Sequence, residues 1–531
     1  MDKIINSYMN FFCCHLLEYS EVENSGICFD GIYSYSENYE KNIGEVIYEL
    51  HIPDIFSNNV NDIVVFYNSA IDYLRGKLRK KLQLLDVKER KKVFYALAAF
   101  QAEFHGRINL INDGMKLDLS NAHPLERTIL LLMENQMYTN QIRGICAIDK
   151  NAVQLIFQEC MEEQMQYDNE KCQISVDKFC EIFGCALTII ELMGKRSFLQ
   201  MGVLNSPVIQ ISDGILTFEG EVGYNSERYV SKLEADMVKY EKIFPESVKT
   251  LLDNNFYKAY GFKIEMVRKI ATSTPTFLTS NTLATESNYA TIVGEFMIAL
   301  KCAQEEAERI FSYLCIDESK RIEKRYDSPE KDENRIFEKC ILKIDKDRYL
   351  YSQVLIGYAY KTLERKLVFN LLEGCSGLNE SIIRKKVKGK FEEEIEQFIE
   401  QYDIKVLRNV HRLGNGNVLS NEVDVIFAIK GTLYVVECKD VSFRFTPTGF
   451  AADMSKERTF IRKMHKKIES VQHNIEYFEE ALNQSIERIE GCLVYRTTNI
   501  VTEIIKCDNG IDIVSAEQFK NRFIQIARGI F

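Results

Sequence analysis

The chain of 531 residues has no tryptophan, only seven prolines and no pair of cysteines with the CxxC spacing. So few prolines argue against Pro-rich linkers and extended disorder. Fifteen scattered cysteines favour buried thiols in a reducing compartment over a disulfide framework or a zinc site. No segment approaches the roughly 18 uninterrupted apolar residues of a membrane span, and the polar start is unlike a signal peptide. We therefore expect a cytoplasmic protein that has no membrane partner.

Negative charge is concentrated in one part of the chain. The net charge is −11, but residues 381–531 hold 23 Lys and Arg against 22 Asp and Glu. The first 380 residues therefore carry the whole acidic excess, 44 basic against 56 acidic side chains. A nucleic-acid partner is thus compatible with the C-terminal part and disfavoured for the rest.

The length favours two to four domains. Apolar residues recur at helical spacing through most of residues 61–200 and again over 287–315, and 207–220 alternates around a turn-forming SDG. We expect a mainly helical regulatory or targeting region over 1–316, in one or two subdomains. A charged linker and connecting segment over 317–384 would follow, with GCSGLNES (374–381) as a hinge. The last domain would cover 385–531.

This last domain has another pattern. An amphipathic helix in KGKFEEEIEQFIEQYD is followed by strand-like runs at 404–410, 422–429 and 432–440, a basic helix over roughly 456–481, and strands at 491–497 and 511–515. This order predicts a layered α/β domain with a central mixed β-sheet. The fold class is therefore multidomain, α followed by α/β.

Three charged residues coincide on the predicted hairpin. Because side chains alternate along a strand, Glu437 and Lys439 point to one face and Cys438 to the other. A hairpin that turns at Lys430-Gly431 brings Asp424 close to Glu437. Three buried charges are costly unless something pairs them, and carboxylate oxygens suit Mg²⁺ or Mn²⁺. Such a metal would polarise a phosphate and acidify water, with Lys439 orienting the water or stabilising developing charge.

The pattern D424-x12-E437-C438-K439 resembles the PD-(D/E)XK nuclease superfamily, over roughly 385–531. GKFEE (389–393) resembles the start of the Mrr-like restriction endonuclease branch, and NEVDVIFAIKGTLYVVECK looks like nuclease domains of CRISPR ancillary effectors. The resemblance implies a restriction-endonuclease-like fold for 385–531. It implies Asp424, Glu437 and the Cys438 backbone carbonyl as metal ligands and Lys439 as the catalytic lysine.

The resemblance also implies further site residues. The helix acid would be Glu392, with Glu393 left open, and Gln472 on the later helix would join the site, with Tyr477 packing. Basic residues of that helix would contact phosphate, namely Lys463, Lys466 and Lys467.

The function implied is an Mg²⁺-dependent endonuclease in bacterial antiviral or restriction-type defence, with DNA favoured over RNA. The acidic region would hold the site closed until a trigger arrives. The alternative is a non-catalytic subunit that binds nucleic acid or protein. A partner protein or a second copy of the chain would bind through the helical region.

Overall fold

The computed structural model divides the chain into two compact units. The helical unit comprises Met1–Leu199, Ser206–Glu221 and Phe256–Leu367, and the sheet unit comprises Gln200–Asn205, Val222–Asn255 and Val368–Phe531. The residues described are all except 1, 20–34, 113, 118, 121, 123, 136–137, 161–172, 202–203, 213–214, 223–245, 274–282, 317–334, 369–370, 384–388, 441–446, 506, 509 and 529–531.

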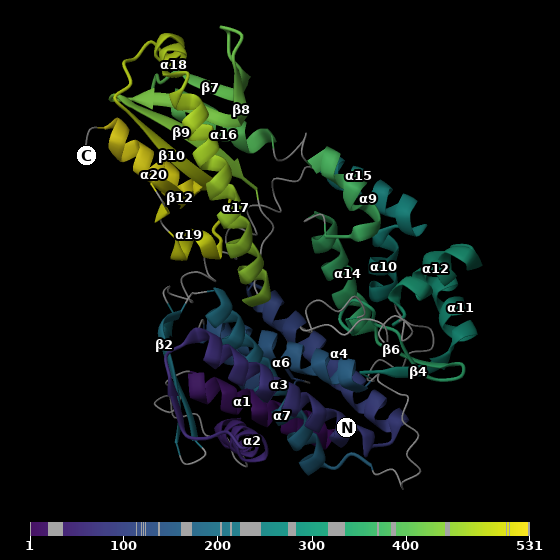
Figure 1. Ribbon diagram of the computed structural model, residues 1–531. Coiled ribbons are helices and arrows are strands. Elements are labelled where there is room, and N and C mark those ends of the chain that lie inside the picture. Colours follow the sequence, from purple (N-terminus) through teal and green to yellow (C-terminus); the bar gives the residue numbers. More distant parts are fainter. Residues whose placement is uncertain are drawn as a thin grey trace. The chain divides into compact units, whose positions relative to one another are not determined.

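Long helices form most of the first unit (Figure 1). Apolar residues at helical spacing explain them: the buried side chains of α3 recur every three or four residues from Ile63 to Leu82. Asn59 caps this helix by accepting a hydrogen bond from the Asn61 N–H. The helices up to the first hairpin are α1 (Asp2–Tyr19), α2 (Tyr35–Glu49), α3 (Val60–Gln83), α4 (Val87–Asn112), α5 (Pro124–Glu134), α6 (Thr139–Cys160) and α7 (Val176–Met201).

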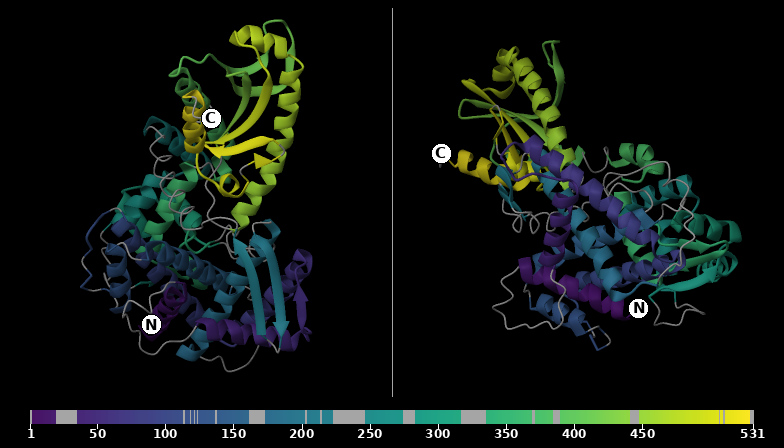
Figure 2. Two further views of the ribbon diagram at one scale, coloured as in Figure 1. Left: turned by 90° about the vertical axis from the view of Figure 1, so that its left-hand side faces the viewer. Right: turned by 60° about the horizontal axis from the view of Figure 1, so that its bottom comes forward.

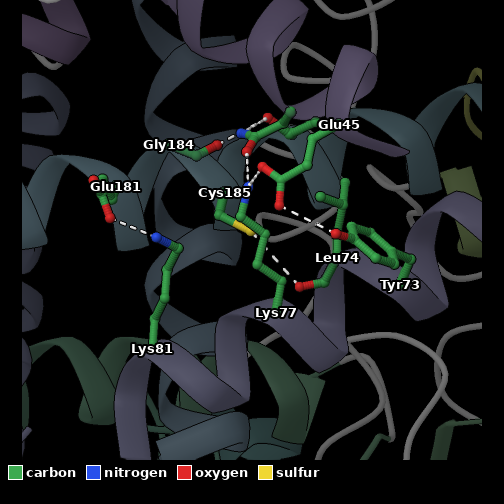
Figure 3. Close-up of polar contacts among 10 residues, drawn as sticks. Glu45, Tyr73, Leu74, Lys77, Lys81, Glu181, Gly184 and Cys185 are labelled. Atoms are coloured by element: carbon green, nitrogen blue, oxygen red, sulfur yellow. Dashed lines mark hydrogen bonds and ion pairs between the residues drawn. The ribbon is translucent and has the colours of Figure 1, made fainter. Parts of the chain in front are cut away.

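Ion pairs join α2 and α7 to α3. Lys77 pairs with Glu45, which also accepts a hydrogen bond from the Tyr73 hydroxyl at 3.1 Å, and Lys81 pairs with Glu181 at 2.5 Å (Figure 3). The basic side chains all come from one helix and the carboxylates from its two neighbours. These contacts fix how the three helices pack around their shared apolar faces.

Two small sheets complete the helical unit. The hairpin expected over 207–220 is confirmed by β2 (Leu204–Ser212) and β3 (Ile215–Val222), with β1 (Ile55–Ser57) antiparallel to β2 (Figure 2). The second sheet has the order β4-β6-β5. Its strands and the helices of this part of the chain are α10 (Ile264–Thr272), β4 (Thr285–Asn288), α11 (Tyr289–Leu300), α12 (Gln304–Leu314), β5 (Leu342–Asp345), β6 (Arg348–Tyr351) and α14 (Gln353–Val368). The preceding helix α9 (Glu246–Tyr260) is divided between the units, because its residues up to Asn255 belong to the sheet unit.

Two sequence expectations are wrong here. The single helix over 287–315 is two helices, because Lys301 adopts a left-handed φ of 53° and ends α11. The expected hinge GCSGLNES lies in a helix, α15 (Glu373–Ile383).

The charged stretch at 317–334 lies outside the described residues. The connecting segment after it contributes to the helical unit: the Tyr95 hydroxyl donates to the carbonyl of buried Cys340 at 2.5 Å.

A six-stranded mixed sheet organises the second unit, and this confirms the central mixed sheet that the order of elements predicted. The strand order is β11-β12-β10-β9-β8-β7; β9 is parallel to β10 and antiparallel to β8. The elements are α16 (Gly389–Glu400), β7 (Val406–Arg412), β8 (Val418–Ile429), β9 (Thr432–Lys439), α17 (Pro447–Gln472), α18 (Ile475–Leu482), β10 (Arg488–Tyr495), α19 (Ile500–Ile504), β11 (Cys507–Asp508), β12 (Ile511–Ser515) and α20 (Ala516–Ala527).

Helices cover both faces of this sheet (Figures 1 and 2). On one face α16 and α20 pack their apolar side chains against alternate residues of β8, β9 and β10, forming a core that includes Phe391, Phe427, Val436 and Phe523. On the other face α17 lies close to β10, so that a Cβ added at Gly491 would meet Ile468 Cδ1 at 2.6 Å. Helix α17 therefore packs directly on this second face of the sheet.

Within the described residues, no helix combines the length and the apolar character needed to cross a membrane.

Candidate active site

A tight turn between β8 and β9 sets the register of the site. Lys430 and Gly431 adopt φ values of 51° and 75°, the left-handed conformation that a two-residue hairpin turn of this kind requires. Ile429 pairs with Thr432, and the ladder continues to Val425 opposite Val436. One further step along both strands places Asp424 opposite Glu437.

Asp424 is tied to the end of β9. Its Oδ2 accepts a hydrogen bond from the backbone N–H of Cys438 at 2.7 Å. The Cys438 side chain lies on the opposite face, against the core under α16. In an extended strand the N–H and C=O of one residue point to the same neighbour. The Cys438 carbonyl therefore points to the side of the strand on which Asp424 lies.

Glu437 lies between two ammonium groups. Lys439 Nζ contacts Glu437 Oε1 at 2.5 Å, and Lys467 Nζ contacts Glu437 Oε2. The three side chains are 18, 13 and 7 % exposed for Lys439, Glu437 and Lys467, so these ion pairs are largely shielded from water. Lys439 Nζ also lies over the Phe460 ring, 4.8 Å from its centroid. Lys467 and Phe460 of α17 therefore contact the charged residues Glu437 and Lys439 at the end of β9.

The acidic residues act on one another. Burial, and then the Glu437 carboxylate, raise the pKa of Asp424 to about 7, against the attraction of Lys467. Burial raises the pKa of Glu392 as well, and the carboxylates of Glu422 and Glu437 raise it further. A bound cation would stabilise the ionised forms of such neighbouring, half-buried carboxyl groups, because its positive charge offsets their mutual repulsion.

Of the two candidate helix acids, Glu392 is the more buried. It is partly buried at the start of α16, and its carboxyl interacts with that of Glu437. Glu393 is exposed and accepts a hydrogen bond from Gln397 of the same helix at 3.3 Å. The burial of the two side chains favours Glu392, and the identity of the helix acid stays a prediction.

The other predicted residues all lie on α17 and differ in their exposure. Gln472 is exposed at the last residue of α17, five residues after Lys467, which places it about 140° around the helix. The structure therefore does not bring Gln472 to the cluster. Lys463 and Lys466 are exposed on α17 and accessible to a ligand. Lys467, predicted with them as a phosphate contact, is instead buried and paired with Glu437.

Sequence reasoning missed a second buried pair near Lys439. The Tyr495 hydroxyl, at the end of β10, donates to Glu457 Oε2 of α17, and both residues are at most 2 % exposed. Burial raises the pKa of Glu457 to about 7, although the Tyr495 hydrogen bond and the charge of Lys439 act in the opposite direction. Glu457 and Lys467 lie ten residues apart on the sheet-facing side of α17. Both residues share this side with buried Met464, at intervals of seven and three residues. This helical spacing in the sequence could have indicated that Glu457 and Lys467 point inward.

The oxygen donors suit a hard divalent cation. Asp424, Glu437 and the Cys438 carbonyl supply oxygen ligands of the kind that Mg²⁺ and Mn²⁺ prefer. Among the described residues no three His, Cys, Asp or Glu side chains converge closely enough to hold a metal as they stand. Lys439 and Lys467 contact the two oxygens of Glu437, one each.

Comparison with known proteins adds no assignment: the chain matches no family model, no curated protein and no solved structure.

Proposed function

We propose that the sheet unit is a metal-dependent phosphodiesterase of restriction-endonuclease-like fold that cuts nucleic acid internally. The observation that carries the proposal is the convergence of Asp424, Glu437 and Lys439 on one sheet face, with Asp424 fixed by the Cys438 N–H. A solvated strand face does not account for this convergence, because these side chains are half-buried and follow the apolar run of β9.

Each residue then has a defined task. Asp424, Glu437 and the Cys438 carbonyl would hold Mg²⁺ or Mn²⁺, which when bound supplies Lewis-acid activation of phosphate and water. Lys439, directed by Glu437 and by the Phe460 ring, would present its ammonium to the attacking water or to the charge that develops on the phosphate. Glu392 would hold or release a proton beside them.

The substrate proposed is DNA, with RNA as the alternative. Exposed Lys463 and Lys466 on α17 supply positive charge beside the site for the phosphate backbone. These contacts read no base, so the proposal is cleavage directed by structure or by a partner rather than by sequence. A role in bacterial defence rests on the resemblance described above, and a cytoplasmic location fits the free cysteines.

The test is cleavage by the purified full chain of supercoiled plasmid, single-stranded DNA and RNA, with Mg²⁺, Mn²⁺ or EDTA. We expect metal-dependent cutting that Lys439→Ala lowers by at least about a hundredfold, the scale of removing a charged transition-state contact. Lys463→Ala removes a lysine from the exposed face of α17 and serves as the matched control. It should weaken nucleic-acid binding most at low salt, where a phosphate contact contributes most, and leave the cleavage rate of bound substrate within about threefold.

The non-catalytic alternative predicts another pattern, and complete neutralisation of Glu437 by two lysines is the observation that favours it. A folded chain that binds nucleic acid equally well with Lys439→Ala, and cuts nothing in either metal, would support that alternative.

A further inference from the structure

Lys467 is the most unusual residue of the site. Its side chain is only 7 % exposed, although lysines normally extend their ammonium groups into water. Its contact with Glu437 Oε2 leaves the remaining oxygen of that carboxylate to Lys439. Burying such a charge is costly unless it is paired, so the Glu437 carboxylate is what retains Lys467 on the inner face of α17.

An ammonium group and a divalent cation compete for this carboxylate oxygen. Both would occupy the lone pairs of Glu437 Oε2, and two cations a few ångströms apart repel each other strongly in a partly buried site. The Lys467 ammonium also acts on Asp424, because its positive charge lowers the pKa that burial and Glu437 raise. Lys467 therefore contacts Glu437 and favours the charged form of Asp424, the two carboxylates to which the proposed function assigns the metal.

We propose that Lys467 occupies the cation position of Glu437 in this structure, and that a divalent metal must displace it to enter. The inference rests on the proposed function and adds a competition: the Lys467 ammonium sets the metal affinity of the site. Once displaced, Lys467 joins Lys463 and Lys466 as a positive charge on α17 next to the substrate. A phosphate anion at the site then favours metal entry, because it offers the displaced ammonium a new partner.

Mn²⁺ binding to the full chain tests this competition without any measurement of cleavage. Free Mn²⁺ would be followed by electron paramagnetic resonance for the wild type, Lys467→Met, Lys467→Arg, Lys456→Met and Glu437→Gln. We expect Lys467→Met to lower the Mn²⁺ dissociation constant by at least about tenfold, the effect of removing one nearby positive charge. Lys467→Arg keeps the charge and Lys456→Met changes an exposed lysine of the same helix, so both should stay within about threefold of the wild type.

The outcomes separate the two proposals. Equal or weaker Mn²⁺ binding in folded Lys467→Met, with binding still abolished by Glu437→Gln, overturns the competition and leaves the metal site standing. Absence of Mn²⁺ binding in both the wild type and Lys467→Met overturns the metal site and with it the competition.

A second measurement uses the wild-type chain alone, in case Lys467→Met does not fold. Reductive methylation followed by mass spectrometry reports how accessible each lysine is. Saturating Mn²⁺ should increase the labelling rate of Lys467 severalfold and leave that of exposed Lys463 unchanged. Labelling of Lys467 that stays constant or decreases while Mn²⁺ is bound would show that the metal does not displace it.

Discussion

At the scale of single residues, the buried pair of Glu457 and Tyr495 makes stability depend on pH. Burial raises the pKa of Glu457 from 4.5 to about 7 in the folded chain. Between these values the folded state binds a proton that the unfolded state has lost, so the free energy of unfolding falls as the pH rises and levels off above about pH 7. Glu457→Gln stays neutral throughout and can still accept the Tyr495 hydrogen bond.

We therefore expect Glu457→Gln to gain stability relative to the wild type as the pH rises from 5 to 8, by at most about 3 kcal/mol. Urea unfolding of both proteins at the two pH values measures the change. Glu393→Gln, an exposed acid of α16, is the control and should show no such difference. A gain for Glu457→Gln that is the same at pH 5 and pH 8 would contradict this assignment.

The residues that sequence could predict are those linked by strand periodicity. Alternation and a two-residue turn suffice to bring Asp424, Glu437 and Lys439 together, because all three lie within one hairpin. Lys467 and Glu457 reach the same place through the packing of α17 on the sheet, 30 residues from Glu437 in the one case and 38 from Tyr495 in the other. A local pattern identifies a basic helix but does not determine which of its lysines turns inward.

At the scale of elements, the turn between β8 and β9 sets the register of the site. Gly431 has a φ of 75°, and a Cβ added there would come within 3.2 Å of the Glu487 side chain. We expect Gly431→Ala to lower the free energy of unfolding by about 1 kcal/mol and Gly431→Asn by less, since asparagine tolerates left-handed backbone better. Urea unfolding checks both variants.

Gly377→Ala is the control for this prediction, because an added Cβ meets nothing within 4 Å on helix α15. It should leave stability unchanged or raise it by up to about 1 kcal/mol. Equal effects of alanine at positions 431 and 377 would show that the turn does not need its glycine.

Sequence periodicity predicted most elements and failed where the chain breaks without a proline or glycine. The break between α11 and α12 falls at Lys301-Cys302-Ala303, which continues the apolar spacing of both helices. The opposite failure occurs at α15, whose glycines suggested a hinge although Cys375 and Asn379 are buried. Asn379 accepts a hydrogen bond from Asn255 at 3.0 Å, a contact that only the tertiary structure supplies.

At the scale of the whole molecule, both units are discontinuous in sequence. The sheet unit takes Gln200–Asn205 and Val222–Asn255 from between segments of the helical unit. Its sheet core is nevertheless local, since every residue of the cluster under α16 and α20 lies between 391 and 527. Composition located the acidic excess before residue 381, but no pattern in the sequence revealed that segments of the two units alternate.

This organisation allows a test of the regulatory hypothesis. We expect a chain of residues 381–531 to cut faster than the full chain, because it lacks the acidic excess that competes with nucleic-acid phosphates. A second piece, 368–531, retains α15 and controls for the truncation of that helix. Cleavage by both pieces, with thermal unfolding to show that they fold, measures the effect. Rates equal to or below that of the full chain would count against an inhibitory role for the first 380 residues.

Helix α17 carries Glu457, Phe460 and Lys467, which contact Tyr495, Lys439 and Glu437 in turn. Because all three residues belong to one helix, a shift of α17 along its axis by the rise of a single residue, about 1.5 Å, would alter all three contacts together. A displacement of α17 would thus change three contacts together: the ion pair of Lys467 with Glu437, the position of Phe460 under the Lys439 ammonium, and the hydrogen bond between Glu457 and Tyr495. The contacts of all three residues at the candidate site therefore depend on the position of one helix.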